Sequence, residues 1–536
     1  MAPVAIESQP RYAPLALVAS HIGTVAYLSY KIGMGLYRSH TALGPAQETR
    51  LRVSQRQKLT TAFASLAALG FALAVSSSLS YLTISYTAWA SERGIEVPNS
   101  LFGGSTPSAD GRNATSLHIA SWLSDTPIYY DAFEIVAEKA RRLWWGQQLN
   151  LAMVSWNMLL AVEGRRRNIP FLWAYSLLAH LVGLSFAQNL FYVAMLLTPS
   201  PIAIWKASRT GIPAEAPNWG PTPGLLYTYL VFHYGAIFCL PCAAGTGIFP
   251  VVATAVKMLS FAPLALHTVV PESWGETRLH CRGGYKSLTR VFHFMSVVSG
   301  LMHLEATAGS ISYNLPESYK HRHSLKIPFD TKKRTPWERS TTAIEAVLGS
   351  MTDHPAVAIV GKDALLCAFS LGLWAAVRAI DVKDVLRLAA PYFKGPEVEE
   401  LMKTQEQIEQ NEAEEIARLA AEPSMTLRRR GRPAKSSVAS ISSSNGPSDE
   451  ATPIRRGRPR KIKQEPTPDP EPDLEEVPGD ATYEPSPEEE AELVEGDIVP
   501  DDDFDWESAS LAWGLTALGG LGTGCSAVYG AECISR

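Results

Sequence analysis

The feature that most constrains this chain is a series of long segments that contain no charged residue. These segments are residues 12–30, 59–91, 143–162, 168–205 and 216–271, the last of which is interrupted only by Lys257. A helix of about 20 apolar residues is long enough to cross the hydrocarbon core of a bilayer. Because a soluble globular domain does not contain several such segments, the sequence predicts an integral membrane protein. A disulfide-linked scaffold is excluded, since the chain has only 6 Cys among 536 residues.

The charge-free segments also predict how many helices cross the membrane. Residues 168–205 are interpreted as one span, and residues 216–271 as two, with a bend between Pro241 and Pro250. Two shorter apolar runs, 291–304 and 364–377, are extended by apolar neighbours and supply further helices. We therefore predict an all-α polytopic membrane protein over residues 1–395, a bundle of seven to eight transmembrane helices with eight favoured.

The composition changes after residue 395, where an acidic and polar tail begins. The composition of residues 396–422 predicts a charged helix. Residues 423–507 contain two basic clusters and a long acidic run rich in Pro, and this composition predicts a disordered tail. Residues 508–536 are almost free of charge and rich in Gly, so they form either a further span or a loose apolar end.

Basic residues orient the predicted helices. Basic side chains are concentrated in the loop at 31–58 and in the short loop at 165–167, and both loops are therefore predicted to be cytosolic. The loop at 92–142 then lies on the opposite side, where Asn113 begins an Asn-Ala-Thr glycosylation sequence. We expect an integral protein of the endoplasmic reticulum.

Each basic cluster of the tail has a Gly-Arg-Pro core flanked by further bases. The arginines concerned are Arg430 and Arg432 in the first cluster and Arg456 and Arg458 in the second. These clusters resemble the AT-hook, which binds the narrow minor groove of A·T-rich DNA. A membrane-tethered DNA-binding or scaffold protein is therefore an alternative function. A basic disordered linker is the favoured interpretation of the clusters, and we do not expect DNA as a partner. A transporter is a third alternative, disfavoured because the spans contain no internal repeat.

The most informative segment for chemistry is residues 124–148. Thr126-Pro127 predicts the start of a helix, on which Asp131 and Glu134 lie on one face. The aromatic residues that flank these acids are Tyr129, Tyr130, Trp144 and Trp145. Acids beside electron-rich rings suit a reaction in which an acid donates a proton and ring faces stabilise a carbocation. An interfacial helix with an aromatic belt is the alternative interpretation.

Further polar residues lie within or beside the predicted spans. Glu163 is a third candidate acid, although it could simply pair with the arginines that follow it. The other candidate substrate-binding residues are Trp156, Gln188, Asn189 and His293. For Gln188 and Asn189, hydrogen bonds between helices are as good an explanation as a pocket. The spacing of His and Cys predicts no metal site.

Three segments resemble fungal membrane-bound terpene cyclases of meroterpenoid pathways, the family of the ascofuranone and macrophorin cyclases. The segments are 125–148, which ends in Arg-Arg-Leu-Trp-Trp-Gly-Gln-Gln, then Glu-Gly-Arg-Arg-Arg at 163–167, and Ser-Phe-Ala-Gln-Asn-Leu-Phe at 185–191. The resemblance covers residues 10–395 and not the tail.

The resemblance implies cyclisation of a farnesyl chain on an aromatic or quinone-type head group. The reaction would start by protonation of an epoxide or an alkene, without loss of diphosphate and without a metal ion or another cofactor. The expected partners are a lipophilic prenylated phenol or quinone-type substrate, membrane lipids and other enzymes of the same pathway. Asp131, Glu134 and Glu163 are the candidate proton donors, in a pocket lined by the segments at 143–162, 168–205 and 291–304.

Overall fold

A computed structural model describes residues 12–42, 50–95, 118–198, 218–278, 285–319, 333–378, 380–389 and 505–534. Within these ranges the chain is helical, apart from a short antiparallel ribbon of two strands, so the predicted helical class is confirmed. In chain order the elements are α1 (Tyr12–Ala42), α2 (Arg50–Glu92), α3 (Ile119–Asp125), α4 (Ile128–Ala137), α5 (Ala140–Leu159), the π-helical turn η2 (Leu160–Gly164), α6 (Leu172–Leu181), α7 (Leu184–Leu197), β1 (Asn218–Pro221), α9 (Pro223–Ala243), α10 (Phe249–Ser260), α11 (Ala262–Val269), η3 (Glu272–Trp274), β2 (Gly275–Arg278), α12 (Tyr285–Tyr313), α13 (Pro336–Gly349), η4 (Ser350–Thr352), α14 (Pro355–Val377), α15 (Val382–Ala389) and α18 (Trp506–Ile534).

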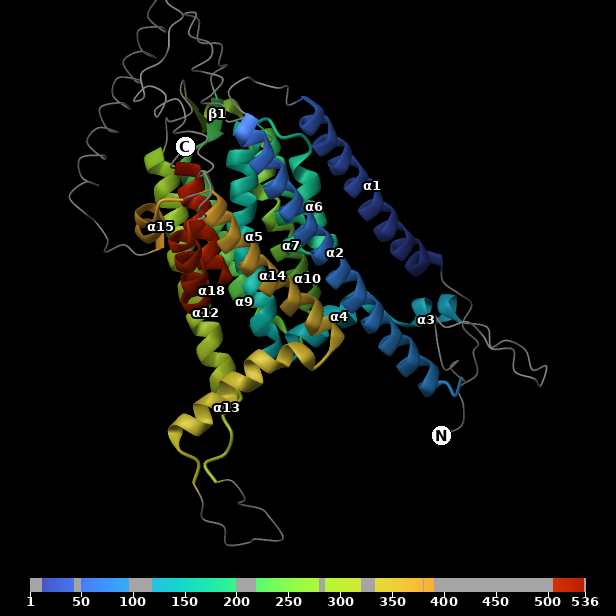
Figure 1. Cartoon of the computed structure of the whole chain (residues 1–536). Coiled ribbons are helices and arrows are strands. Elements are labelled where there is room, and N and C mark those ends of the chain that lie inside the picture. Colours follow the sequence, from blue (N-terminus) through green and yellow to red (C-terminus); the bar gives the residue numbers. More distant parts are fainter. Residues whose placement is uncertain are drawn as a thin grey trace, which may run out of the picture.

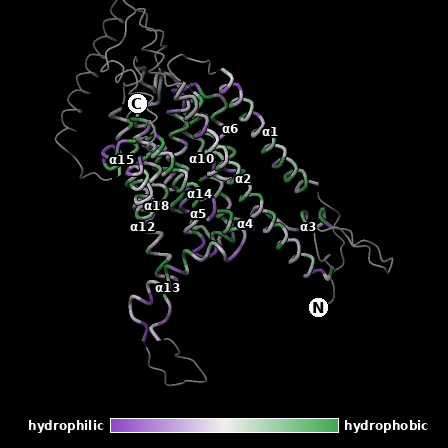
Figure 2. The backbone as a smooth tube through the Cα atoms, viewed as in Figure 1, coloured by the Kyte–Doolittle hydropathy of each residue, from purple (hydrophilic) through white to green (hydrophobic). Residues whose placement is uncertain are grey.

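The long helices lie side by side in one bundle, with α5 among them and α1 at its edge (Figure 1). The helices α3, α4 and α13 lie at one end, which we call the α4 end, and the β1–β2 ribbon lies at the opposite end, which we call the β1 end (Figure 1). Residues 151–161 of α5 and η2 are all buried, so this segment forms part of the bundle interior. Hydrophilic residues gather around α13 and α15 rather than along the long helices (Figure 2).

Among the described residues, five helices are long and apolar enough to cross a membrane: α1, α2 from Lys58 onwards, α9, α14 and α18. The pair α10–α11, which bends by 62°, adds a sixth if it is counted as one span. The predicted number of seven to eight spans is therefore not confirmed by helix length and composition. The predicted bend between residues 241 and 250 is confirmed, because α9 ends at Ala243 and α10 begins at Phe249.

The segment 168–205 was predicted to be one span, and this prediction is wrong for its described part. It holds two short helices, α6 of 10 residues and α7 of 14 residues, separated by Val182 and Gly183. Arg167, just before α6, donates hydrogen bonds to the carbonyl oxygens of Met195 and Thr198 at the end of α7. The two helices are therefore antiparallel and form a hairpin that enters and leaves the bundle at the β1 end.

The C-terminal apolar segment is helical and packs into the bundle, so it is not a loose end. The helix α18 is broken at Gly520, which has φ 81° and ψ 165°. Ser508, near its start, donates a hydrogen bond to the carbonyl oxygen of Ala375, and Glu532, near its end, pairs with Arg378. Since both ends of α18 lie beside the last turns of α14, α18 is a second hairpin with its base at the β1 end. The predicted charged helix at 396–422 and the predicted disorder at 423–507 concern segments outside the described residues.

Candidate functional site

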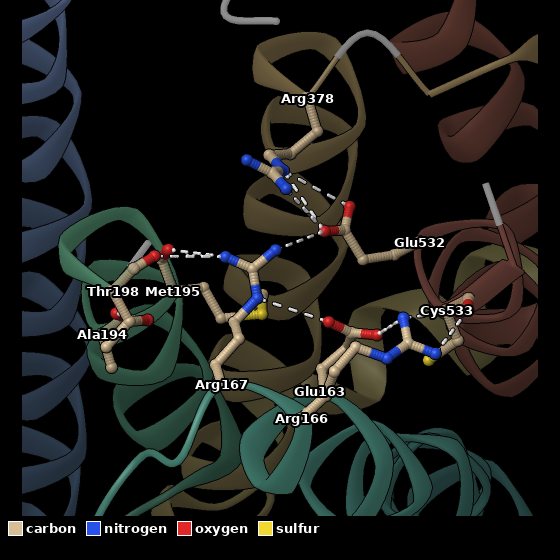
Figure 3. Close-up of polar contacts among 9 residues, drawn as sticks. All are labelled: Glu163, Arg166, Arg167, Ala194, Met195, Thr198, Arg378, Glu532 and Cys533. Atoms are coloured by element: carbon tan, nitrogen blue, oxygen red, sulfur yellow. Dashed lines mark hydrogen bonds and ion pairs between the residues drawn. The ribbon is translucent and has the colours of Figure 1, made fainter. Parts of the chain in front are cut away.

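A buried cluster of charged side chains joins the ends of four helices at the β1 end of the bundle (Figure 3). Glu163 lies in η2 at the end of α5, and its carboxylate accepts hydrogen bonds from Arg166 and, at 3.3 Å, from Nε of Arg167. Glu532 of α18 lies 2.9 Å from Nη2 of Arg378 and 3.8 Å from Nη2 of Arg167. Both carboxylates are at most 1% exposed, so the attraction between these charges is only weakly screened by water.

Backbone oxygens complete the cluster. Arg166 donates to the carbonyl oxygen of Cys533 at 3.2 Å, while Arg167 reaches the end of α7 (Figure 3). The cluster therefore fixes the bases of both hairpins, α6–α7 and α18, against α5 and α14. Each of the two carboxylate oxygens of Glu163 is therefore occupied by an arginine. These contacts favour the ion-pair interpretation of Glu163 over its role as an acid.

The tip of the α6–α7 hairpin is held by a carboxylate from α14. Asp363 accepts hydrogen bonds of 2.8 Å from the backbone N–H groups of Leu184 and Ser185, the first residues of α7. A negative charge at a helix N-terminus is stabilised by the unpaired N–H groups and by the helix dipole. Asp363 therefore caps a helix that begins inside the bundle.

The tip of the α18 hairpin is held by a different set of side chains. The N–H of Leu521 donates to Oε1 of Gln148 at 3.0 Å, and Nε2 of Gln148 lies 2.9 Å from Nδ1 of His303. Gly520 has no room for a side chain, because a Cβ there would lie 2.6 Å from the His303 ring. Gln148 and Asp363 each lie about 12 Å into α5 and α14 from the α4 end, so the two tips reach a similar depth.

The acids predicted from residues 124–148 lie on α4, which begins at Ile128 directly after Thr126-Pro127 as predicted. Asp131 is half-buried, whereas Glu134, one turn further on, is exposed. Burial raises the pKa of the Asp131 carboxyl group, and the nearby charge of Glu134 raises it further. Tyr81 of α2 holds the start of α4 through a hydrogen bond of 2.7 Å to the carbonyl oxygen of Ile128.

Aromatic rings surround α4 and the first turns of α5. The Tyr129 ring lies 5.6 Å from the ring of His21, and the Tyr130 ring lies 6.3 Å from that of Phe249. Trp144 and Trp145 contact each other edge to face at 4.9 Å. The indole N–H of Trp144 donates to Thr307 at 2.9 Å, and its ring lies 5.9 Å from that of His303.

The remaining candidates for substrate binding lie elsewhere in the bundle. Trp156 is fully buried in the second half of α5. Gln188 donates to the hydroxyl of Tyr192 at 2.7 Å within α7 itself. Asn189 donates to Ser370 at 2.9 Å and so joins α7 to α14. His293 contacts the carbonyl oxygen of Leu388 through Nδ1 at 3.1 Å.

The structure does not bring the three candidate acids together. Asp131 precedes α5 and Glu163 follows it, and α5 has 20 residues, so the two acids are separated by about 30 Å along its axis. Asp131 and Glu134 share the α4 end with Tyr129, Tyr130, Trp144 and Trp145, whereas Glu163, Gln188 and Asn189 belong to the interior and the β1 end.

The sequence did not single out four residues that hold the tips and bases of the hairpins: Asp363, Gln148, Arg378 and Glu532. Each pairs with a residue far away in the chain, so no local pattern identifies them. Among the described residues, no three His, Cys, Asp or Glu side chains lie close enough together to hold a metal ion. The glycosylation candidate Asn113 and the four tail arginines, Arg430, Arg432, Arg456 and Arg458, lie outside the described ranges.

Comparisons with known proteins identify no relative. A search of protein families, a search of curated proteins and a search of solved structures each found no match to this chain.

Proposed function

We propose that this protein is a membrane-bound terpene cyclase that cyclises the farnesyl chain of a lipophilic prenylated phenol or quinone-type substrate. The observation that carries the proposal is the half-buried Asp131 carboxyl group, whose pKa is raised by burial and by the charge of Glu134. A carboxyl group that keeps its proton at higher pH can act as the general acid that starts the reaction. The resemblance of residues 125–148 to fungal cyclases points to the same segment.

In the proposed reaction, Asp131 donates its proton to the epoxide oxygen or to an alkene carbon of the farnesyl chain. The neighbouring double bond attacks the electron-poor carbon and closes a ring, which moves the positive charge along the chain. Loss of a proton from the last cation then gives the cyclised product. Tyr129, Tyr130, Trp144 and Trp145 would supply ring faces that stabilise the intermediate cations. The low water content of a bilayer would protect these cations from capture by water.

Glu134 has a different role in this proposal. Its carboxyl group is exposed, and its charge raises the pKa of Asp131 one turn away. Glu163 is not a proton donor in the proposal, because its two carboxylate oxygens contact Arg166 and Arg167 at the opposite end of α5.

For the membrane arrangement, we propose seven crossings, made by α1, α2, α5, α9, the bent pair α10–α11, α12 and α14. The hairpins α6–α7 and α18 then enter from the β1 end and turn back without crossing. The basic residues 165–167 belong to the β1 end, which is therefore proposed to be cytosolic. Asp131 lies at the opposite end, on the side of the loop that contains Asn113, as expected for a protein of the endoplasmic reticulum.

The test is expression of the full chain in a host fed with farnesylated phenol epoxides, followed by product analysis. Asp131→Asn should abolish the cyclised product at an unchanged protein level, whereas Glu138→Gln, which changes an exposed acid at the end of the same helix, should not. Full activity of the Asp131→Asn variant would exclude Asp131 as the acid. If no farnesylated phenol is cyclised, the proposed function is wrong.

The two hairpins favour a transporter as a second candidate, since discontinuous helices whose tips meet near the midplane are typical of secondary transporters. Detergent-solubilised protein distinguishes the candidates. A cyclase forms product without a closed compartment, whereas a transporter requires one.

A further inference from the structure

A shallow groove opens between α1 and the base of the α6–α7 hairpin. It is lined by Lys31, Ile32 and Gly35 of α1 and by Ile169, Phe171 and Tyr175 of the α6 side. Its floor is apolar, because Ile32, Ile169 and Tyr175 are at most 5% exposed. An apolar floor at a helix boundary suits an acyl chain better than a polar soluble ligand.

The groove has one charged residue among its lining residues, Lys31. The amino group lies 5.6 Å from the centre of the Tyr27 ring and 5.8 Å from that of Phe171, so two rings orient it. None of the ion pairs formed within the described ranges includes Lys31. A cation beside an apolar floor is chemically matched to a lipid with an anionic head group.

The backbone beside the groove has an uncommon conformation. Asn168 and Phe171 have φ angles of 52° and 60°, in the left-handed region that residues other than glycine rarely adopt. This conformation is costly for an aromatic residue. It places the Phe171 ring, which is 43% exposed, against Lys31 at the mouth of the groove.

The position of the groove identifies the leaflet. Thr198, at the base of the hairpin, lines the groove and accepts a hydrogen bond from Arg167 of the buried charge cluster, so the groove lies at the β1 end. This is the end that the basic residues indicate to be cytosolic, and the cytosolic leaflet is rich in anionic lipids. We propose that the groove binds an anionic phospholipid, with its phosphate at Lys31 and an acyl chain along the floor between α1 and the hairpin.

The test is native mass spectrometry of the full chain in detergent, with phosphatidylglycerol or phosphatidylcholine added at equal concentration. The wild type should retain phosphatidylglycerol about five-fold better, the factor expected for one basic side chain at a lipid head group. Lys31→Gln should remove this preference. Lys58→Gln is the matched control, because Lys58 is an exposed lysine near the start of α2 that does not line the groove.

A second variant tests the floor without changing the charge. Gly35 lies on a helix, and a Cβ there meets only a side-chain atom of Pro170 at 3.8 Å, so Gly35→Leu should fold and fill the groove. Gly35→Leu should reduce the binding of both lipids. In a separate competition with the wild type, glycerol phosphate should not displace the lipid, because it has no acyl chain. The proposal is overturned if Lys31→Gln retains the preference, if Gly35→Leu binds like the wild type, or if glycerol phosphate displaces the lipid.

Discussion

Neutralising Glu532 should release the base of the α18 hairpin. The Glu532 carboxylate is 0% exposed and lies between Arg378, at 2.9 Å, and Arg167, at 3.8 Å. Glu532→Gln preserves the shape of the side chain but leaves two buried guanidinium groups with one negative charge fewer. Removing one partner of a buried ion pair typically costs about 3–5 kcal/mol, which changes the unfolding equilibrium constant by more than a hundred-fold.

The expected cost comes from the charge left behind rather than from the contact itself. Combining Glu532→Gln with Arg378→Met removes one charge of each sign and leaves Glu163 with Arg166 and Arg167. The double variant should therefore lose about 2 kcal/mol less of its free energy of unfolding than the two single losses add up to. An exposed pair provides the control: Glu138, whose side chain is 57% exposed, pairs with Arg142 at 3.2 Å, and Glu138→Gln should cost less than about 0.5 kcal/mol.

Equilibrium unfolding in detergent micelles, followed by tryptophan fluorescence, measures these differences. If Glu532→Gln costs no more than Glu138→Gln, the buried cluster does not fix the hairpin. If the effects of Glu532→Gln and Arg378→Met are simply additive, the two residues do not act as a pair.

Three further predictions concern the acid on α4 and the hairpin tips. Burial and the charge of Glu134 raise the pKa of Asp131, so the cyclisation rate should fall as pH rises through that pKa. Glu134→Gln should lower the pKa of Asp131, and the pH–rate profile of this variant should therefore fall at a lower pH than that of the wild type. Gly520→Ala should destabilise the protein by more than about 2 kcal/mol, because the backbone φ there is 81° and the new Cβ would contact the His303 ring. Gly514→Ala is the control: a Cβ at Gly514 meets no atom within 4 Å, so this variant should be neutral or stabilising in thermal unfolding. Asp363→Asn should weaken the cap of α7 by about 1–2 kcal/mol, which should speed hydrogen exchange at the N–H groups of Leu184 and Ser185. Asp381→Asn, at the exposed start of α15, is the control and should leave exchange at these two groups unchanged.

The sequence predicted those parts of the fold that depend on local composition. Charge-free segments identified α1, α2 and α5, and prolines identified the bend between α9 and α10 and the start of α4. Each of these signals acts through residues close together in the chain, such as a long apolar run or a ring that fixes the backbone.

The hairpins could not be predicted in this way, because their determinants are distant contacts. A helix that crosses the membrane and a pair of short helices that turn back have the same apolar composition, so composition cannot distinguish them. What stabilises the turn at Gly520 is a hydrogen bond between residues 373 positions apart, Leu521 and Gln148. The turn after α6 likewise depends on Asp363, which is 179 positions from Leu184. A single sequence contains no signal that pairs such residues.

The hairpins also explain several of the polar residues of the interior. A helix that begins inside an apolar bundle exposes N–H groups that need partners, and Asp363 and Gln148 provide them. At the bases of the hairpins, the buried carboxylates of Glu163 and Glu532 are paired with arginines. Asp131 has no such explanation, since it is half-buried, its pKa is raised, and no ion pair within the described ranges includes it. Asp131 lies in the first turn of α4, where a carboxylate interacts favourably with the helix dipole, but its raised pKa opposes that charge. A half-buried carboxyl group that favours its protonated form is suited to donate a proton, and the proposed reaction therefore begins at Asp131.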